Sequence, residues 1–254
     1  MPDYILYILL AITGLIAGFV NTLAGGGSFL TIPALIYFFN LPPQIANATN
    51  RFSVIFYAGT SSSIFLKHGL TDYRLMLRLL IPSIVGAVCG AGAAAILPPK
   101  SFQLIFGIAM ILMALTFILK PKILLETRHR TKPTPIKELF VFYLIGFYGG
   151  FMQAGVGLLL LAGIAIFHAK DLVKSNAIKV TLAFFFGFVS VAIFAYYGQI
   201  DYVKGAVIAI GAIIGALIGA KLAIKKGARL IFFFVITIAI ITGINLIYTT
   251  FTTS

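Results

Sequence analysis

The sequence predicts an all-α fold: a polytopic membrane helical bundle built from two inverted repeats, each with a broken or re-entrant first helix pair plus three full spans. Three observations predict it. Of the 254 residues, 61% are hydrophobic and only 10% are charged, whereas a soluble domain is about 45–50% apolar and about 25% charged. The apolar residues form long runs, and the two halves of the chain resemble each other. This composition excludes a soluble enzyme, a disordered regulator and a secreted disulfide scaffold.

Glycine, proline and charged residues divide the chain into apolar segments that we expect to be helical. In the first half these are residues 4–20, 29–39, 52–66, 75–97 and 102–119, and in the second half 138–152, 156–167, 180–197, 203–222 and 230–248. The polar residues 120–137 carry most of the clustered charge. We therefore expect a first membrane repeat at 1–119, a cytoplasmic linker at 120–137 and a second membrane repeat at 138–254.

The segment boundaries follow the local residue types in order along the chain. Segment 4–20 stops at the glycine-rich residues 21–28, and the short segment 29–39 is interrupted by Pro33. Segments 75–97 and 203–222 follow matching turns that contain Asp72 and Asp201, which we expect to cap those helices. Segment 138–152 stops at residues 153–155, a second break that precedes the short segment 156–167.

The halves of the chain match at a constant displacement of 129 residues. It places residues 69–73 on 198–202, 86–91 on 215–220 and 47–48 on 176–177, and a displacement of 128 places Gly27 on Gly155. These matches indicate a tandem duplication. Glycine and alanine at four-residue spacing in 86–94 and 211–223 indicate close helix contacts, within one chain or between the chains of a homodimer.

The distribution of basic residues predicts that the second repeat is inverted. If each broken pair crosses twice, or enters and returns, 16 of the 19 Lys and Arg residues share one side, and only Arg51, Lys100 and Lys204 lie opposite. If each pair crosses once, the split is nearly even. The first topology gives an odd number of crossings per half, so the repeats are inverted. It places both termini on the outer side of the membrane.

Several function classes are excluded by the residues that the chain lacks. The net charge of +13 would suggest nucleic acid in a soluble protein, but membrane proteins gather Lys and Arg in cytoplasmic loops, so we expect no nucleic-acid partner. The single Cys89 and the three His residues cannot build a metal site. All six acidic residues fall in loops or at segment ends. We expect no metal, no cofactor and no enzyme activity.

The two breaks predict a binding site for a small anion. Glycine in a helix costs about 1 kcal/mol per residue, and unwound backbone at membrane depth is tolerated where it lines a cavity or is buried in protein. If the chain from Phe29 onwards is helical, Gly27 and Ser28 lie at a helix N-terminus, which favours an anion. A helix-packing contact is the alternative.

A second polar stretch, residues 47–51 with its counterpart 175–179, precedes a long apolar segment in each half. In one interpretation its Asn and Thr residues are helix N-caps. The guanidinium of Arg51 could hold a sulfonate-like or carboxylate-like group by paired hydrogen bonds. The alternative is an arginine that extends to the lipid head groups.

Residues 18–35, which read GFVNTLAGGGSFLTIPAL, followed by 41–43 and 46–51, resemble the TauE/SafE family of sulfite exporter-like membrane proteins and anion permeases. The resemblance covers essentially the whole chain. It implies export or uptake of sulfite or small organosulfur anions across a bacterial inner membrane. The family's glycine-rich loop and Thr-Asn-basic motif fall on Asn21, Ala24, Gly25, Gly26 and Gly27 and on Thr49, Asn50 and Arg51. The second copy departs from the pattern, because Gln153-Ala154-Gly155 replaces a fuller glycine cluster.

These observations together predict a secondary transporter for a small anion, such as sulfite or sulfoacetate, that works by alternating access around the glycine-rich broken helices of a multi-pass protein in the lipid bilayer. A passive anion channel and a non-transporting membrane scaffold subunit remain alternatives. The residues expected to bind the substrate are Asn21, Thr22, Ala24, Gly25, Gly26, Gly27, Ser28, Asn47, Thr49, Asn50, Arg51, Gln153, Gly155, Asn176 and Lys179.

Overall fold

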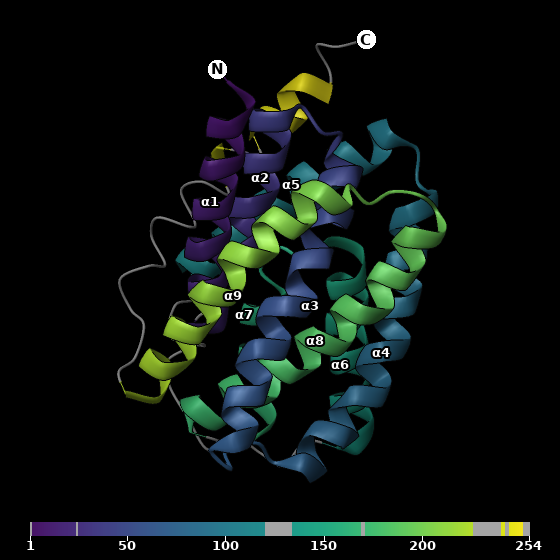
Figure 1. Cartoon of the computed structure of the whole chain (residues 1–254). Helices are drawn as coiled ribbons and strands as arrows, with labels where there is room; N and C mark the ends of the chain where they lie inside the picture. The colour runs from purple at the N-terminus through teal and green to yellow at the C-terminus, as the bar shows by residue number, and fades with distance from the viewer. Residues whose placement is uncertain are drawn as a thin grey trace.

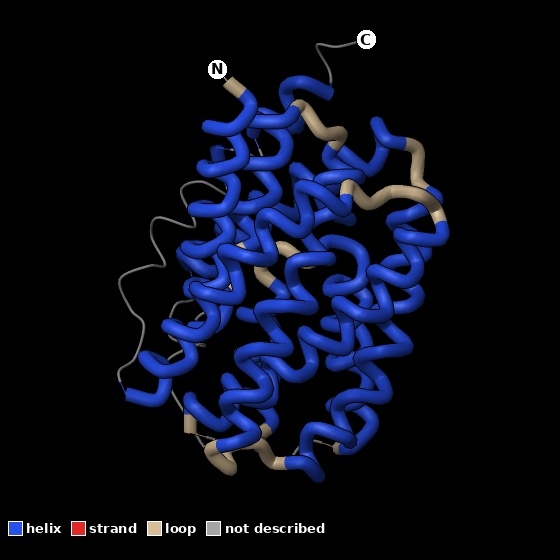
Figure 2. Tube along the Cα trace, viewed as in Figure 1, coloured by secondary structure: helices blue, strands red, loops and turns tan. Residues whose placement is uncertain are grey.

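The computed structural model describes residues 2–23, 25–119, 134–168, 171–225, 240–241 and 244–250, and every regular element in them is a helix (Figures 1 and 2). The predicted all-α fold is therefore confirmed. Four helices of this part of the chain are long and apolar enough to cross a membrane. In chain order the helices are α1 (Asp3–Leu23), α2 (Ser28–Phe39), α3 (Pro43–Lys67), α4 (Tyr73–Ile96), α5 (Pro99–Leu119), α6 (Pro135–Met152), α7 (Val156–Phe167), α8 (Leu172–Tyr196) and α9 (Tyr202–Lys225).

Two helices begin well before their predicted starts. The α3 helix begins at Pro43, where a proline at the first helical position fits its fixed φ, and α8 begins after the N-cap Asp171. The polar residues 47–51 and 175–179 therefore lie inside helices, and the interpretation of Asn47 and Asn176 as N-caps is wrong. The apolar runs did not include these helical turns, because their residues are polar. Polar residues fit there because the side chains face other helices instead of lipid.

The caps predicted at the two matching turns are confirmed. The Asp72 carboxylate accepts a hydrogen bond from the backbone N–H of Leu75 at 3.1 Å. The Asp201 carboxylate accepts one from the backbone N–H of Lys204 at 3.0 Å. Each satisfies one of the unpaired donors at a helix start.

Each broken pair of helices is a hairpin whose two outer ends lie together. The ring of Tyr7, near the start of α1, contacts that of Phe39 at the end of α2, with 5.2 Å between centroids. In the second half, Glu138 in the first turn of α6 lies 2.5 Å from the Nε2 of His168, directly after α7. Each pair therefore enters the bundle and returns to the same end.

The two hairpins enter from opposite ends of the bundle. Contacts with the two ends of α4 show this. Gln44, at the start of α3 just beyond the first hairpin, donates to the carbonyl of Ala94 near the end of α4 at 2.5 Å. Arg78, near the start of α4, pairs with Glu138 of the second hairpin at 2.5 Å. This is the arrangement that an inverted duplication produces.

The halves interlock through two close helix pairs, α1 with α9 and α4 with α6. A Cβ added to Gly18 of α1 would lie 2.6 Å from the Cα of Ala212 of α9, and one added to Gly150 of α6 would lie 2.6 Å from the Cα of Ala87 of α4. The close helix contacts predicted from the small residues are thus present. Because each pair takes one helix from each half, the halves do not pack as separate bodies.

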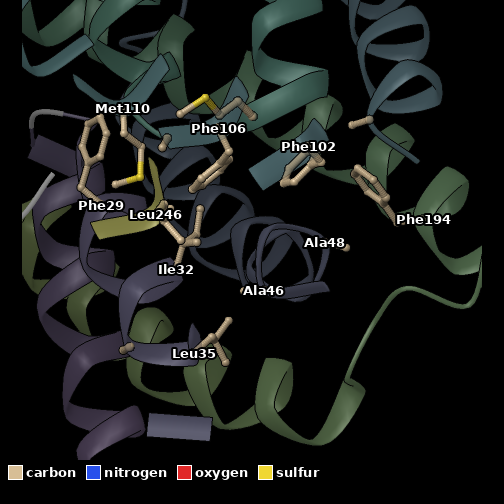
Figure 3. Close-up of a cluster of buried hydrophobic side chains, with 14 of the residues drawn as sticks. Phe29, Ile32, Leu35, Ala46, Ala48, Phe102, Phe106, Met110, Phe194 and Leu246 are labelled. Carbon is tan, nitrogen blue, oxygen red and sulfur yellow. The ribbon is translucent and has the colours of Figure 1, made fainter. Parts of the chain in front are cut away.

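A buried apolar cluster closes the bundle around α2, α3 and α5 (Figure 3). Phe29 at the start of α2 lies beside Met110 of α5, and Phe102 stacks on Phe106 with 5.5 Å between ring centroids. Phe102 and Phe106 of α5 and Phe194 of α8 are fully buried. This cluster fixes α2 against the long helices.

The close pairing of α4 and α6 predicts opposite effects of alanine at two glycines of α4. A Cβ at Gly86 would lie 2.7 Å from the backbone nitrogen of Phe147, whereas one at Gly92 would meet nothing within 4 Å. We expect Gly86→Ala to cost about 1–3 kcal/mol through overpacking and Gly92→Ala to stabilise α4 by up to about 1 kcal/mol. Thermal unfolding in detergent measures both, and equal melting temperatures would contradict the contact.

Candidate functional site

The two helix breaks meet at the centre of the bundle, backbone against backbone. Gly25 and Gly155 adopt left-handed φ angles of 92° and 77°, which favour glycine. A Cβ added to Gly25 would lie 2.6 Å from the Cα of Gly157. The breaks approach each other as the sequence predicts, but this direct contact leaves no room for a solute between Gly25 and Gly157 in this conformation.

Arg51 lies fully buried on α3 beside the second break. Its Nη1 donates to the carbonyl of Gly149, to Oε1 of Gln153 at 3.0 Å and to Oγ of Ser190 at 3.2 Å. Its Nε and Nη2 have no hydrogen-bond partner among the described residues. The expectation that Arg51 lies on the outer side, and the alternative of an arginine reaching the lipid head groups, are therefore wrong.

Lys179 lies equally deep on α8, beside the first break, and is 2% exposed. Its Nζ donates to the backbone carbonyls of Asn21 at 2.8 Å and Thr22 at 3.1 Å. Asn176, one turn earlier, donates to the carbonyl of Thr22 at 2.7 Å. The sequence count placed Lys179 in a loop on the basic side, which is also wrong. If both buried cations are removed from the count, most of the remaining Lys and Arg residues still share one side of the membrane.

The two cations occupy reciprocal positions. Arg51, from the first half, donates to Gly149 in the last turn of α6, and Lys179, from the second half, donates to Asn21 in the last turn of α1. Asn47 repeats the role of Asn176, because its Nδ2 donates to the carbonyl of Phe151 at 3.1 Å. Each long helix thus caps the carboxyl end of the broken helix from the opposite half. Those ends would otherwise leave carbonyls unpaired.

The charges at this centre do not balance. The buried acidic side chain among the described residues is Glu138, which pairs with Arg78 and His168 instead. A helix carboxyl end supplies only about half a negative charge, so two such ends cannot neutralise Arg51 and Lys179. Burying a charge without a partner costs several kcal/mol. An anion bound near the breaks would remove this imbalance.

Other predicted site residues brace the breaks. The side chain of Asn21 accepts from the N–H of Gly27 at 2.7 Å, so one donor expected for an anion at the start of α2 is already used. Asn50 accepts from Thr31 at 2.5 Å and donates to Ser28 at 3.1 Å.

The remaining predicted residues are also tied to the surrounding backbone and side chains. Thr49 accepts from the backbone N–H of Asp201 at 3.0 Å, and the Thr22 hydroxyl pairs with that of Ser61 at 2.7 Å. Gly26 is buried, and its carbonyl accepts from the N–H of Phe29 at 3.1 Å. Ala24 lies outside the described residues.

Sequence reasoning missed two residues that complete the second break. Ser190 of α8 contacts Arg51 at 3.2 Å, and the hydroxyl of Tyr148 donates to the carbonyl of Ala154 at 2.6 Å. Both stand in apolar segments. A polar atom in such a segment is the signal that could have found them, since buried hydroxyls need a partner.

Comparison with known proteins gives consistent matches along the chain. The family model described as Sulfite exporter TauE/SafE matches residues 10–246. A "Probable membrane transporter protein ORF9" from Sinorhizobium sp is 28% identical over 97% of this chain and 95% of its own. A "Probable membrane transporter protein" from Haemophilus influenzae is 29% identical over 86% and 85%, and the "Probable membrane transporter protein YfcA" of Escherichia coli is 26% identical over 92% and 87%.

The reciprocal caps predict similar costs for two substitutions far apart in the sequence. Asn47→Ala and Asn176→Ala each remove a side-chain donor to the last turn of a broken helix. We expect each to lower the free energy of unfolding by about 1–3 kcal/mol, because a buried carbonyl loses its partner. Thermal unfolding measures this, with the exposed Asn245→Ala as a neutral control. A variant that melts with the wild type would show that its cap is not needed.

Proposed function

Because the chain belongs to the Sulfite exporter TauE/SafE family, we propose that it is a secondary transporter for a small anion, sulfite or a short organosulfur anion. The anion binds beside the two helix breaks and crosses a bacterial inner membrane by alternating access. The relatives named as probable membrane transporters support the transport class, and the central geometry supports the anion.

The observation that carries this proposal is the unpaired edge of the Arg51 guanidinium. Nε and Nη2 lie on the same edge of the group, so their N–H bonds are parallel. Both lack partners in a side chain that is 0% exposed. Two parallel donors match two oxygens of a sulfite, sulfonate or carboxylate group. Such a pair in a dry site binds an oxyanion more strongly than it would in water.

A free acceptor lies one helical turn from this edge. The Oδ1 of Asn47 is buried and has no partner among the described residues, and Asn47 and Arg51 share a face of α3 because they are four residues apart. A protonated oxygen can donate to this acceptor. The pair of residues therefore fits an anion that carries both charge and a hydroxyl proton, as hydrogensulfite does.

The interlocked helix pairs indicate which parts move in such a cycle. The contact of Gly25 with Gly157 must open for a solute to pass. Because α1 packs on α9 and α4 on α6, each moving unit contains helices from both halves. The hairpins enter from opposite ends, so moving one opens the centre to one side only.

The positive-inside rule supports the proposed orientation. Lys67 at the end of α3, Arg74 and Arg78 at the start of α4 and Lys137 in α6 lie at the end of the bundle where the second hairpin enters. The N-terminus begins at the opposite end (Figure 1), near residues 244–250, where the carbonyl of Leu246 accepts from Gln103 at 3.1 Å. On this basis we propose that the N-terminus and residues 244–250 face the periplasm.

Arg51→Met tests the proposal directly. It removes the free edge and the charge, so we expect the Kd for sulfite or sulfoacetate to rise about 10- to 100-fold, the loss of a charge-assisted hydrogen-bond pair. The exposed Arg74→Met on α4 is the matched control and should bind as the wild type does. Thermal shift of the purified proteins over a concentration series measures each Kd.

Proteoliposomes distinguish a carrier from a channel. A carrier loaded with unlabelled sulfite should accelerate uptake of labelled sulfite and saturate, whereas unitary currents without counterflow would favour the channel. Unchanged anion binding in Arg51→Met would contradict the site, and a wild type that binds no member of the panel of sulfite, sulfate, taurine and sulfoacetate would contradict the function.

A further inference from the structure

We propose that Lys179 is the proton-carrying residue of this transporter. Its ammonium group caps the carboxyl end of α1 while an anion is bound, and it releases that proton to water when the hairpin of α1 and α2 moves. A proton and an anion would then cross together. This inference rests on the proposed function, because it assigns the coupling of that same site.

The first argument is the position of Lys179 on a helix break. Its Nζ holds two successive carbonyls, those of Asn21 and Thr22, at 2.8 and 3.1 Å. Carboxyl ends of broken helices and unwound carbonyls are where transporters bind their coupling cation. Here the cation is the ammonium group of Lys179 itself. Because this group is covalently attached to α8, its positive charge can leave only as a proton.

The second argument is the difference between the two reciprocal cations. Arg51 and Lys179 cap the broken helices in the same manner, but a guanidinium stays charged in proteins, whereas a buried lysine can lose its proton. Arg51 is therefore suited to hold the anion throughout the cycle. Lys179 is the member of the pair that can change its charge.

The surroundings of Lys179 contain no fixed negative charge that would lock the proton in place. Among the described residues of the elements packed against α8, the buried titratable groups are Tyr57 and Arg51 on α3 and Glu138 on α6, to which α6 adds the half-buried Tyr148 and α4 the exposed Arg78. Glu138 is already paired with Arg78 and His168. In the described part of the chain, the hydrogen-bond partners of the Lys179 amine are backbone carbonyls, which cannot accept its proton.

Loss of the proton changes the first break directly. A neutral amine forms weaker hydrogen bonds than an ammonium group. Thr22 keeps the donor from Asn176, whereas the carbonyl of Asn21 loses its charged partner. The side chain of Asn21 accepts from the N–H of Gly27 at 2.7 Å, so a movement of Asn21 reaches the start of α2.

Proton and anion binding should therefore favour each other. The protonated centre carries one more positive charge and attracts an anion more strongly, and by linkage a bound anion holds the proton on Lys179. The coupling predicted is symport of an anion and a proton. The affinity for the anion should fall as the pH rises.

The test uses purified protein in proteoliposomes that contain a pH-sensitive dye, in sodium-free buffer. Sulfoacetate is the probe, because it is fully ionised near neutral pH and carries no proton itself. In the wild type, an inward sulfoacetate gradient should acidify the lumen. Lys179→Arg keeps the charge permanently, so we expect proton movement and the pH dependence of Kd to be lost, and counterflow measured beside them shows whether the variant still carries the anion.

Two further variants complete the design. Lys174→Arg, an exposed lysine on the same helix, should behave as the wild type does in every assay. Lys179→Met imitates the deprotonated state, and we expect it to bind sulfoacetate at least 10-fold more weakly at every pH. If Lys179→Arg does not fold, the methionine variant and the wild-type dye signal still decide the matter.

The outcomes separate this inference from the proposed function. A wild type that binds no anion overturns the proposed function and this inference with it. A wild type that transports sulfoacetate without moving protons overturns the role of Lys179 alone, and so does a Lys179→Arg variant that still acidifies the lumen.

Discussion

The structure depends on how the carboxyl ends of two interrupted helices are satisfied in an apolar environment. Each interruption leaves backbone carbonyls without helical partners, and such groups cost several kcal/mol each in lipid. Side chains from a long helix of the opposite half donate hydrogen bonds to these carbonyls. Asn47 and Arg51 of α3 donate to the end of α6. Asn176 and Lys179 of α8 donate to the end of α1. This exchange requires α3 and α8 to lie side by side at the centre of the bundle, and the other helices pack around that pair.

The same exchange leaves the centre positively charged, beyond what capping requires. A neutral amide would be enough to cap a carbonyl, and Asn47 and Asn176 already do so. The additional cations exceed what the helix ends need, because each end offers about half a charge. This excess of buried positive charge supports the proposed binding of an anion. The absence of charged side-chain partners at Arg51 and Lys179 among the described residues is therefore the central electrostatic feature of the fold.

Composition, with the positions of glycine, proline and charged residues, was enough to predict the all-α membrane bundle and the residues at which α2, α6 and α7 end, whereas α1 continues past its predicted end at residue 20 to Leu23. They were not enough to place α3 and α8, because polar residues such as Asn47 and Asn176 mimic a cap in sequence. The sequence offered Arg51 as a candidate, but its environment was not predictable, since Gly149 lies 98 positions away. The partner of Lys179 lies 158 positions away. Glu138 gave no signal beyond its position at a segment end, yet it joins three elements.

The outer ends of the two hairpins are fastened by different kinds of contact. The hairpin of α6 and α7 is held to α4 by the contacts of the buried Glu138 with Arg78 and His168, whereas the ends of α1 and α2 meet through the rings of Tyr7 and Phe39. An aromatic contact tolerates sliding, but an ion pair buried on one side does not. The two hairpins are therefore unequal in stiffness. We expect the inward-open and outward-open states of the proposed cycle to differ in population at rest. The hairpin of α1 and α2 is held less tightly, so the state in which it has moved should form more readily.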